Sequence, residues 1–135
     1  MILTFASQQD YDEMSGKTVG EPVWSADDFA AMHAFMTKLN NDLAASGELV
    51  ETRALAAPVH ARRLSTREGA PVVTDGPYAE TQEVLAGYWI VEVDSFDRAT
   101  EIAARFGECP VPPQAAARAY ADVRPIMDSA AELDL

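Results

Sequence analysis

The residues best suited to chemistry are gathered in one short segment, VVTDGPYAETQE, at residues 72–83. It supplies three carboxylates within nine residues, from Asp75, Glu80 and Glu83, and a phenol from Tyr78. Carboxyl groups brought together under partial burial have raised pKa values, which suits them to act as general acids or bases. The segment therefore predicts either a site in a cleft or a sharp structural corner.

The corner interpretation depends on the Asp-Gly-Pro triplet. The Asp75 carboxylate could accept backbone N–H bonds in an Asx-type turn. Gly76 would be extended because it precedes a proline, and Pro77 fixes its own φ and removes a donor. A divalent metal held by Asp75, Glu80 and Glu83 is a third interpretation, since such ions prefer oxygen ligands, although the spacing matches no known metal loop.

Two histidines could titrate near neutral pH. His60 opens the first strand of an expected hairpin and would approach Asp75 if the turn centres on residues 68–69. We therefore take His60, Asp75 and Glu80 as candidate catalytic residues. His33 lies on the flank of an amphipathic helix and, with Tyr78 and Arg62, is a candidate ligand-binding residue. Structural roles for both histidines remain the alternative.

Three of only ten basic residues, Arg53, Arg62 and Arg63, fall in the same expected strand region. They either balance charge on an acidic protein or form a patch that binds a small anionic ligand through the guanidinium fork. The spacing of the cysteine and the histidines matches no zinc site. The sequence also shows no nucleophilic cysteine and no phosphate loop, so we expect neither metal nor cofactor.

Composition narrows the classes of partner. The chain has 135 residues, 48% of them hydrophobic, and a formal charge of −12. This charge disfavours nucleic acid and anionic membranes as partners, because both present phosphates. With one cysteine and neither a signal-peptide pattern nor a membrane-length apolar run, we expect a cytoplasmic protein.

The remaining segments predict the elements that must position these residues. Strands are expected at 1–5, 48–56, 84–93 and 118–127, with a hairpin between about 59 and 75 turning at 67–70. Helices are expected over 26–45, capped by Ser25, and over 96–106, with an inner face that includes Phe96 and Ile102. Residues 8–24 show no period and predict a long loop, either a lid or disordered.

This order, β-α-β-hairpin-β-α-β, predicts one α+β domain at 1–127 followed by a loose tail at 128–135. Two split βαβ units form a ferredoxin-like antiparallel sheet with both helices on one face and an extra hairpin. The other face of the sheet would remain partly apolar, so we expect a homodimer of the dimeric α/β-barrel type that packs sheet against sheet.

Residues 72–93 closely resemble the signature of the YCII-related superfamily, in its DGPF-domain branch. The residues that match are Asp75, Gly76, Pro77, Ala79, Glu80, Thr81, Glu83, Gly87 and Tyr88. Three positions depart from the pattern, with Tyr78 for Phe, Gln82 for Lys and Ala86 for Gly.

The resemblance implies a dimeric ferredoxin-like protein of bacterial origin, from a family often encoded beside extracytoplasmic-function sigma factors. It also implies acid–base chemistry by a histidine and an aspartate, but neither His33 nor His60 lies in a matching motif. We expect a small-molecule-binding dimer of unknown activity, with a small polar or anionic ligand. The alternatives are a cofactor-free isomerase or lyase and a non-catalytic module linked to sigma-factor-dependent regulation.

Overall fold

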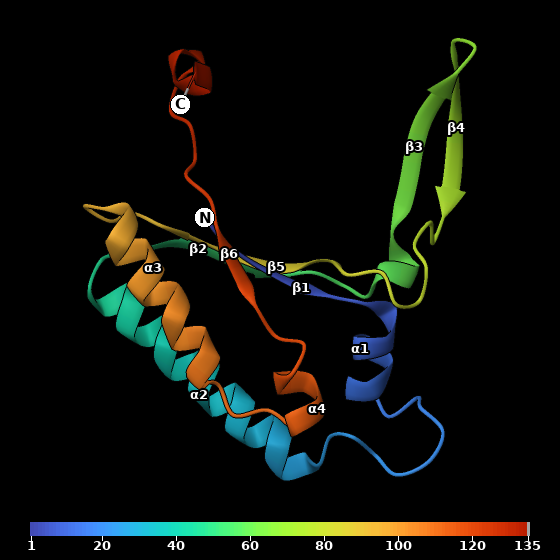
Figure 1. The fold of residues 1–135 in the computed structure, drawn as a ribbon, viewed down its shortest axis with the longest axis horizontal. Helices are drawn as coiled ribbons and strands as arrows, with labels where there is room; N and C mark the ends of the chain where they lie inside the picture. Colours follow the sequence, from blue (N-terminus) through green and yellow to red (C-terminus); the bar gives the residue numbers. More distant parts are fainter. Residues whose placement is uncertain (135) are drawn as a thin grey trace.

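The structure is a computed structural model that describes residues 1–134. A four-stranded antiparallel sheet has the order β2-β5-β1-β6, and a separate two-stranded sheet pairs β3 with β4 (Figure 1). The strands are β1 (Ile2–Ala6), β2 (Leu49–Ala54), β3 (Arg62–Arg67), β4 (Ala70–Asp75), β5 (Val84–Val91) and β6 (Ala121–Val123). The helices are α1 (Gln8–Met14), α2 (Ala26–Ala45), α3 (Phe96–Arg105) and α4 (Pro113–Ala116), with 3₁₀ turns η1 (Pro58–His60), η2 (Phe106–Glu108) and η3 (Ala130–Asp134).

The long helix α2 begins where the sequence predicts. Its N-cap is Ser25, whose hydroxyl accepts the Asp28 N–H, while the Asp28 carboxylate accepts the Ser25 N–H and completes a capping box. Both orphan donors at the helix start are thereby satisfied. The shorter α3 is capped in a similar way by Ser95, whose hydroxyl accepts the Arg98 N–H.

The core lies between the four-stranded sheet and these two helices. Ile2 of β1, Leu39 and Leu43 of α2 and Ile102 of α3 are at most 1% exposed and form one cluster. Trp89 of β5 packs edge-on against Phe106, with ring centroids 4.4 Å apart. Figure 1 shows α2 and α3 side by side below the sheet.

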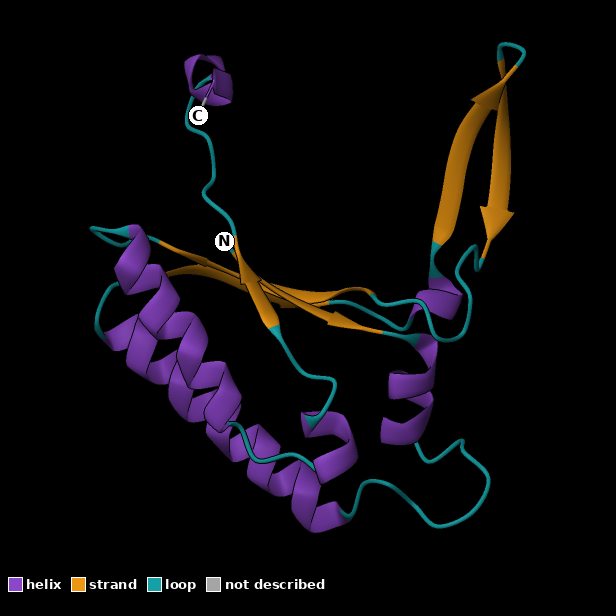
Figure 2. Cartoon of the chain, in the orientation of Figure 1, coloured by secondary structure: helices purple, strands orange, loops and turns teal. Residues whose placement is uncertain are grey.

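The hairpin β3–β4 stands apart from this body (Figure 2). It pairs in register from Arg62 opposite Asp75 to Arg67 opposite Ala70, and the turn falls at Glu68 and Gly69, as the sequence predicts. Every residue from 62 to 71 is exposed. The C-terminal segment rises on the same side of the sheet, opposite to α2 and α3.

Several expectations from the sequence were wrong. Residues 8–24 contain helix α1, whose capping box joins Ser7 and Asp10. A second short helix, α4, was not expected and begins at Pro113. The last strand covers Ala121–Val123 rather than 118–127. Phe96 is 55% exposed because it is the first residue of α3 and lies at its outer end.

Candidate functional site

Helix α1 is hydrogen-bonded both to residues 76–83, which follow β4, and to the linker of residues 55–61, which joins β2 to the hairpin. The N–H of Gln9 donates to the carbonyl of Glu80 (3.0 Å), and the Gln8 side chain accepts the N–H of Val59 (2.8 Å). The Tyr11 hydroxyl donates to the carbonyl of Leu55 (2.8 Å). A seven-residue helix thus holds together two loops that lie more than 40 residues away in the sequence.

Gly76 makes the corner between β4 and the signature segment. Its φ is +53°, in the left-handed region that glycine enters without steric cost, so the extended geometry expected before Pro77 was wrong. Its N–H donates to the carbonyl of Ala61 (2.8 Å), which ties the corner to the linker.

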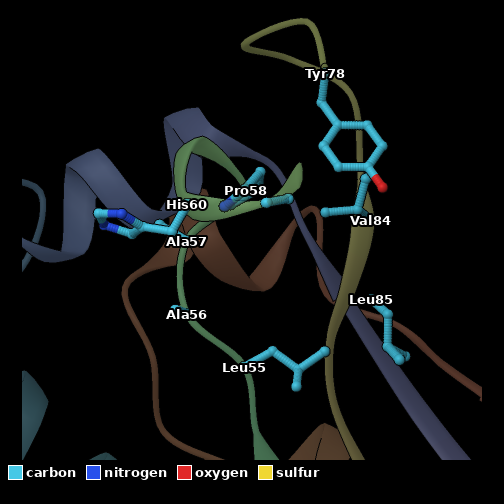
Figure 3. Close-up of a pocket in the computed structure, with 9 residues that line it drawn as sticks. Leu55, Ala56, Ala57, Pro58, His60, Tyr78, Val84 and Leu85 are labelled. Carbon is cyan, nitrogen blue, oxygen red and sulfur yellow. The ribbon is translucent and has the colours of Figure 1, made fainter. Parts of the chain in front are cut away.

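These two loops enclose a shallow pocket of about 270 Å³ (Figure 3). Its walls are mostly apolar, and Tyr78 and His60 contribute the polar side chains. In Figure 3 the Tyr78 hydroxyl points toward Val84, whereas the His60 ring extends away from Tyr78. The residues that line the pocket are Leu55, Ala56, Ala57, Pro58, His60, Ala61, Tyr78, Val84 and Leu85.

A guanidinium group lies against Tyr78, one of the residues that line this pocket. The Arg63 side chain is placed over the Tyr78 ring, 5.2 Å from its centroid, which is a cation–π arrangement. Within the described chain Arg63 forms no ion pair, so its charge is available to an anion that enters beside Tyr78. Of the three candidate arginines, Arg63 is the one that the structure places over the Tyr78 ring.

In the described part of the chain, the Asp75 carboxylate is hydrogen-bonded to neither of the two partners that the sequence suggested, which were His60 and the backbone N–H groups of its own turn. It accepts a charged hydrogen bond from Arg62 Nε at 2.7 Å, directly across the hairpin. Among the described residues it accepts no backbone N–H, so the expected Asx-type turn was wrong. Arg62, a candidate ligand-binding residue, is therefore already paired.

The other candidates are spread over the molecule. Glu80 is exposed and contributes its backbone carbonyl to the contact with α1. His33 is exposed on α2. No hydrogen bond or ion pair among residues 1–134 joins His60, Asp75 and Glu80, so their joint acid–base role stays a prediction. In the same part of the chain, no three His, Cys, Asp or Glu side chains are grouped to hold a metal ion.

A charged cluster that sequence reasoning missed lies on the other side of α1. Arg118 pairs with Asp10, with 2.9 Å between Nε and Oδ1, and with Glu13, whose side chain is only 10% exposed. Trp24 lines a small hollow of about 130 Å³ beside this cluster. Because the Asp10–Arg118 pair spans more than 100 residues, no local pattern could reveal it; only the Ser7–Asp10 capping box was visible in the sequence.

Glu83 of the signature anchors the segment that precedes β6. The Tyr120 hydroxyl donates to Glu83 at 2.7 Å, and the Tyr120 ring stacks on Phe5 with centroids 5.3 Å apart. The hydrogen bond to this carboxylate raises the pKa of Tyr120 to about 12, because ionisation would place two negative charges side by side. Glu83 is thus occupied by a structural contact.

These features define an α+β protein whose element order and sheet order are consistent with a ferredoxin-like fold. The YCII-related domain family matches residues 17–128, and the chain belongs to that family. An uncharacterised protein of Rhizobium meliloti (strain 1021) is 28% identical over 80 residues. That match covers 59% of this chain and 64% of the relative, so the chain spans less than two thirds of the relative's length. None of the helices described is both long enough and apolar enough to cross a membrane.

Proposed function

We propose that this protein is a homodimer of the DGPF branch that binds a small carboxylate with an apolar body in the Tyr78 pocket. The observation that carries the proposal is the position of Arg63, which forms no ion pair among residues 1–134 and lies 5.2 Å from the centre of the Tyr78 ring. Tyr78 itself lines a pocket with mostly apolar walls. An apolar pocket with a few convergent polar groups is the common form of a small-molecule site.

The ligand class follows from the lining. Leu55, Val84 and Leu85 offer hydrocarbon contacts, while the Tyr78 hydroxyl can donate or accept a hydrogen bond. Arg63 supplies a planar fork of donors that suits a carboxylate. A cavity of about 270 Å³ limits the ligand to a small molecule.

The dimer is supported by the face of the sheet opposite to α2 and α3. Strand residues alternate between faces, so Leu3 and Tyr88, which pair across β1 and β5, lie on the face opposite to Ile2 and Trp89. The segment after β6, which leaves the sheet on this side (Figure 1), carries Ile126 and Met127, each 49% exposed. Apolar surface of this kind is commonly covered by a second copy in a two-fold dimer.

Ligand binding can be tested with a panel of short-chain and aromatic monocarboxylates, each compared with its uncharged amide. We expect some acids to raise the melting temperature and their amides to do so less. Titration calorimetry should then show at least about tenfold weaker binding for Arg63→Gln, as the loss of a charge-assisted hydrogen bond would cause.

Two variants make the ligand test specific. Tyr78→Phe should weaken binding by removing one hydrogen bond, while Arg67→Gln is the matched control because it makes the same change on the same face of the hairpin, four residues further on. Equal affinities for the Arg63→Gln variant and the wild type would contradict the proposal, as would a panel in which amides bind as well as acids.

A further inference from the structure

The Tyr78 pocket has two walls, and helix α1 contacts both of them from outside the pocket. One wall is the linker of residues 55–61, and the other is formed by Tyr78 and the start of β5. The described residues that line the pocket include none from α1. Any influence of α1 on a bound ligand must therefore act through the position of the walls.

Two side chains of α1 hold the linker wall. The Tyr11 hydroxyl donates to the carbonyl of Leu55, which itself lines the pocket (2.8 Å). Burial raises the pKa of Tyr11, so its hydroxyl remains a donor at neutral pH. The Gln8 side chain accepts the N–H of Val59, whose two neighbours in the chain line the pocket (2.8 Å). The apolar linker is thus fixed by two polar groups of one helix.

The first turn of α1 also holds the opposite wall. The Gln9 N–H donates to the carbonyl of Glu80, two residues after Tyr78 (3.0 Å). This bond uses one of the N–H groups that a helix start leaves without an intrahelical partner. Because one rigid helix turn contacts both walls, its position sets the distance between them.

The direct bonds between the walls lie at the two ends of the linker. The Leu55 N–H donates to the Ala86 carbonyl, and the Gly76 N–H donates to the Ala61 carbonyl, both at 2.8 Å. Val59 lies between these two points and is bonded to α1 instead. The middle of the linker wall therefore depends on the helix rather than on the wall across the pocket.

Helix α1 is held on its other side by Arg118, in the segment between α4 and β6. Arg118 forms ion pairs with Asp10 and Glu13, whose side chains are only 20% and 10% exposed. At about 100° per residue these two carboxylates lie on the side of the helix opposite to Gln8 and Tyr11. Poorly solvated carboxylates depend strongly on their cationic partner, so Arg118 fixes the position of the helix.

We propose that Gln8 and Tyr11 are positioning residues of the Tyr78 pocket, and that Arg118 fixes the helix from which they act. The inference rests on the proposed ligand site and names residues that control it without touching the ligand. A pocket whose walls are already in place loses less conformational freedom when a ligand binds. Loosening the linker wall should therefore weaken binding and reduce discrimination between ligands of different size.

Titration calorimetry with the tightest-binding monocarboxylate of the panel, well below every melting temperature, tests this role. Gln8→Met and Tyr11→Phe each remove one hydrogen bond to the linker and should weaken binding by about threefold to tenfold. Both should also narrow the difference in affinity between short and longer acids, which a mere loss of stability would leave unchanged. Gln114→Met, on the exposed α4, and Tyr88→Phe, outside the pocket lining, are the matched controls and should bind as the wild type does.

Hydrogen exchange tests the positioning role without a ligand. The Val59 amide should exchange at least about fivefold faster in Gln8→Met, because its acceptor is lost. In Arg118→Gln the Gln9 and Val59 amides should both exchange faster, while the amides paired between β1 and β5 keep their wild-type rates.

The outcomes separate this role from the ligand site itself. A wild type that binds no acid of the panel contradicts the proposed function, and the exchange rates then decide the positioning role alone. Unchanged affinity and size discrimination in both Gln8→Met and Tyr11→Phe would overturn the positioning role, as would an unchanged exchange rate of the Val59 amide in Gln8→Met.

Discussion

Arg62 and Asp75 form an ion pair across the base of the hairpin, with 2.7 Å between Nε and Oδ1, and face each other in the strand register. This pair places Asp75 at the base of the exposed hairpin, and Asp75 is not among the residues that line the pocket. Its side chains are 64% and 75% exposed, so water screens the interaction.

Replacing Asp75 by Asn should change the free energy of unfolding by less than about 1 kcal/mol, because exposed ion pairs contribute little. Chemical denaturation of Asp75→Asn, Arg62→Gln and the double variant forms a cycle that isolates the pair. A loss above about 2 kcal/mol would contradict this assignment, since it would require a buried role for the carboxylate. Ligand binding in the Tyr78 pocket should be unaffected.

Gly87 of β5 is required for close strand packing. A methyl group there would lie 3.1 Å from the Arg53 carbonyl oxygen and 3.4 Å from the Thr4 hydroxyl. Gly87→Ala should therefore destabilise the protein by about 1–3 kcal/mol, as overpacking in a filled interior does.

Gly107→Ala is the matched control for this substitution. A methyl group at Gly107 would meet nothing within 4 Å, and its φ is not in the left-handed region. Its unfolding free energy should stay within about 0.5 kcal/mol of the wild type. Equal stability of the two alanine variants in denaturant melts would refute the steric explanation of Gly87.

Glu48 should make the free energy of unfolding depend on pH below about 4.5. Hydrogen bonds from Arg98, and then from the Ser46 hydroxyl, lower the pKa of Glu48 from its ordinary value of 4.5 to about 2. The unfolded chain therefore binds more protons than the folded one between these values, and stability falls as pH drops from about 4.5 toward 2.

Urea denaturation at a series of pH values can measure this contribution. Glu48→Gln should flatten the slope between pH 4.5 and 2, because the titrating group is gone. Glu108→Gln, at an exposed position, should leave the slope as in the wild type. An unchanged slope in Glu48→Gln would show that the Arg98 contact does not hold in solution.

The hydrogen bond to Glu83 should shift the ionisation of Tyr120 to higher pH. Its pKa of about 12 depends first on the hydrogen bond to Glu83, so Glu83→Gln should return it toward 10. Tyrosinate absorbance measured against pH in the wild type, Glu83→Gln and Tyr120→Phe assigns the transition. A wild-type titration identical to that of Glu83→Gln would contradict the contact.

Local patterns in the sequence were enough to identify most of the regular elements. The apolar stripe and serine cap placed α2, and the β-branched segments about Glu68-Gly69 placed the hairpin, because such signals depend on residues a few positions apart. Helix α1 has the same kind of cap but only seven residues, too few to show a helical period, and it was missed.

The site depended on contacts that no local pattern carries. Asp75 could meet His60, its own backbone or Arg62, and only the strand register selected Arg62. The pairing of Arg118 with Asp10 joins residues more than 100 positions apart, and the placement of α1 under the signature segment likewise depends on the packed chain.

The sequence alone therefore determined the strands, the two longer helices and the resemblance to the YCII-related family, since periodicity, caps and turn residues act locally. The tertiary structure decided which side chains meet. In the folded chain Asp75 pairs with Arg62, Glu83 accepts the Tyr120 hydroxyl, and Arg63 lies over the Tyr78 ring. Burial and pairing of this kind are set by elements that come together only when the sheet forms.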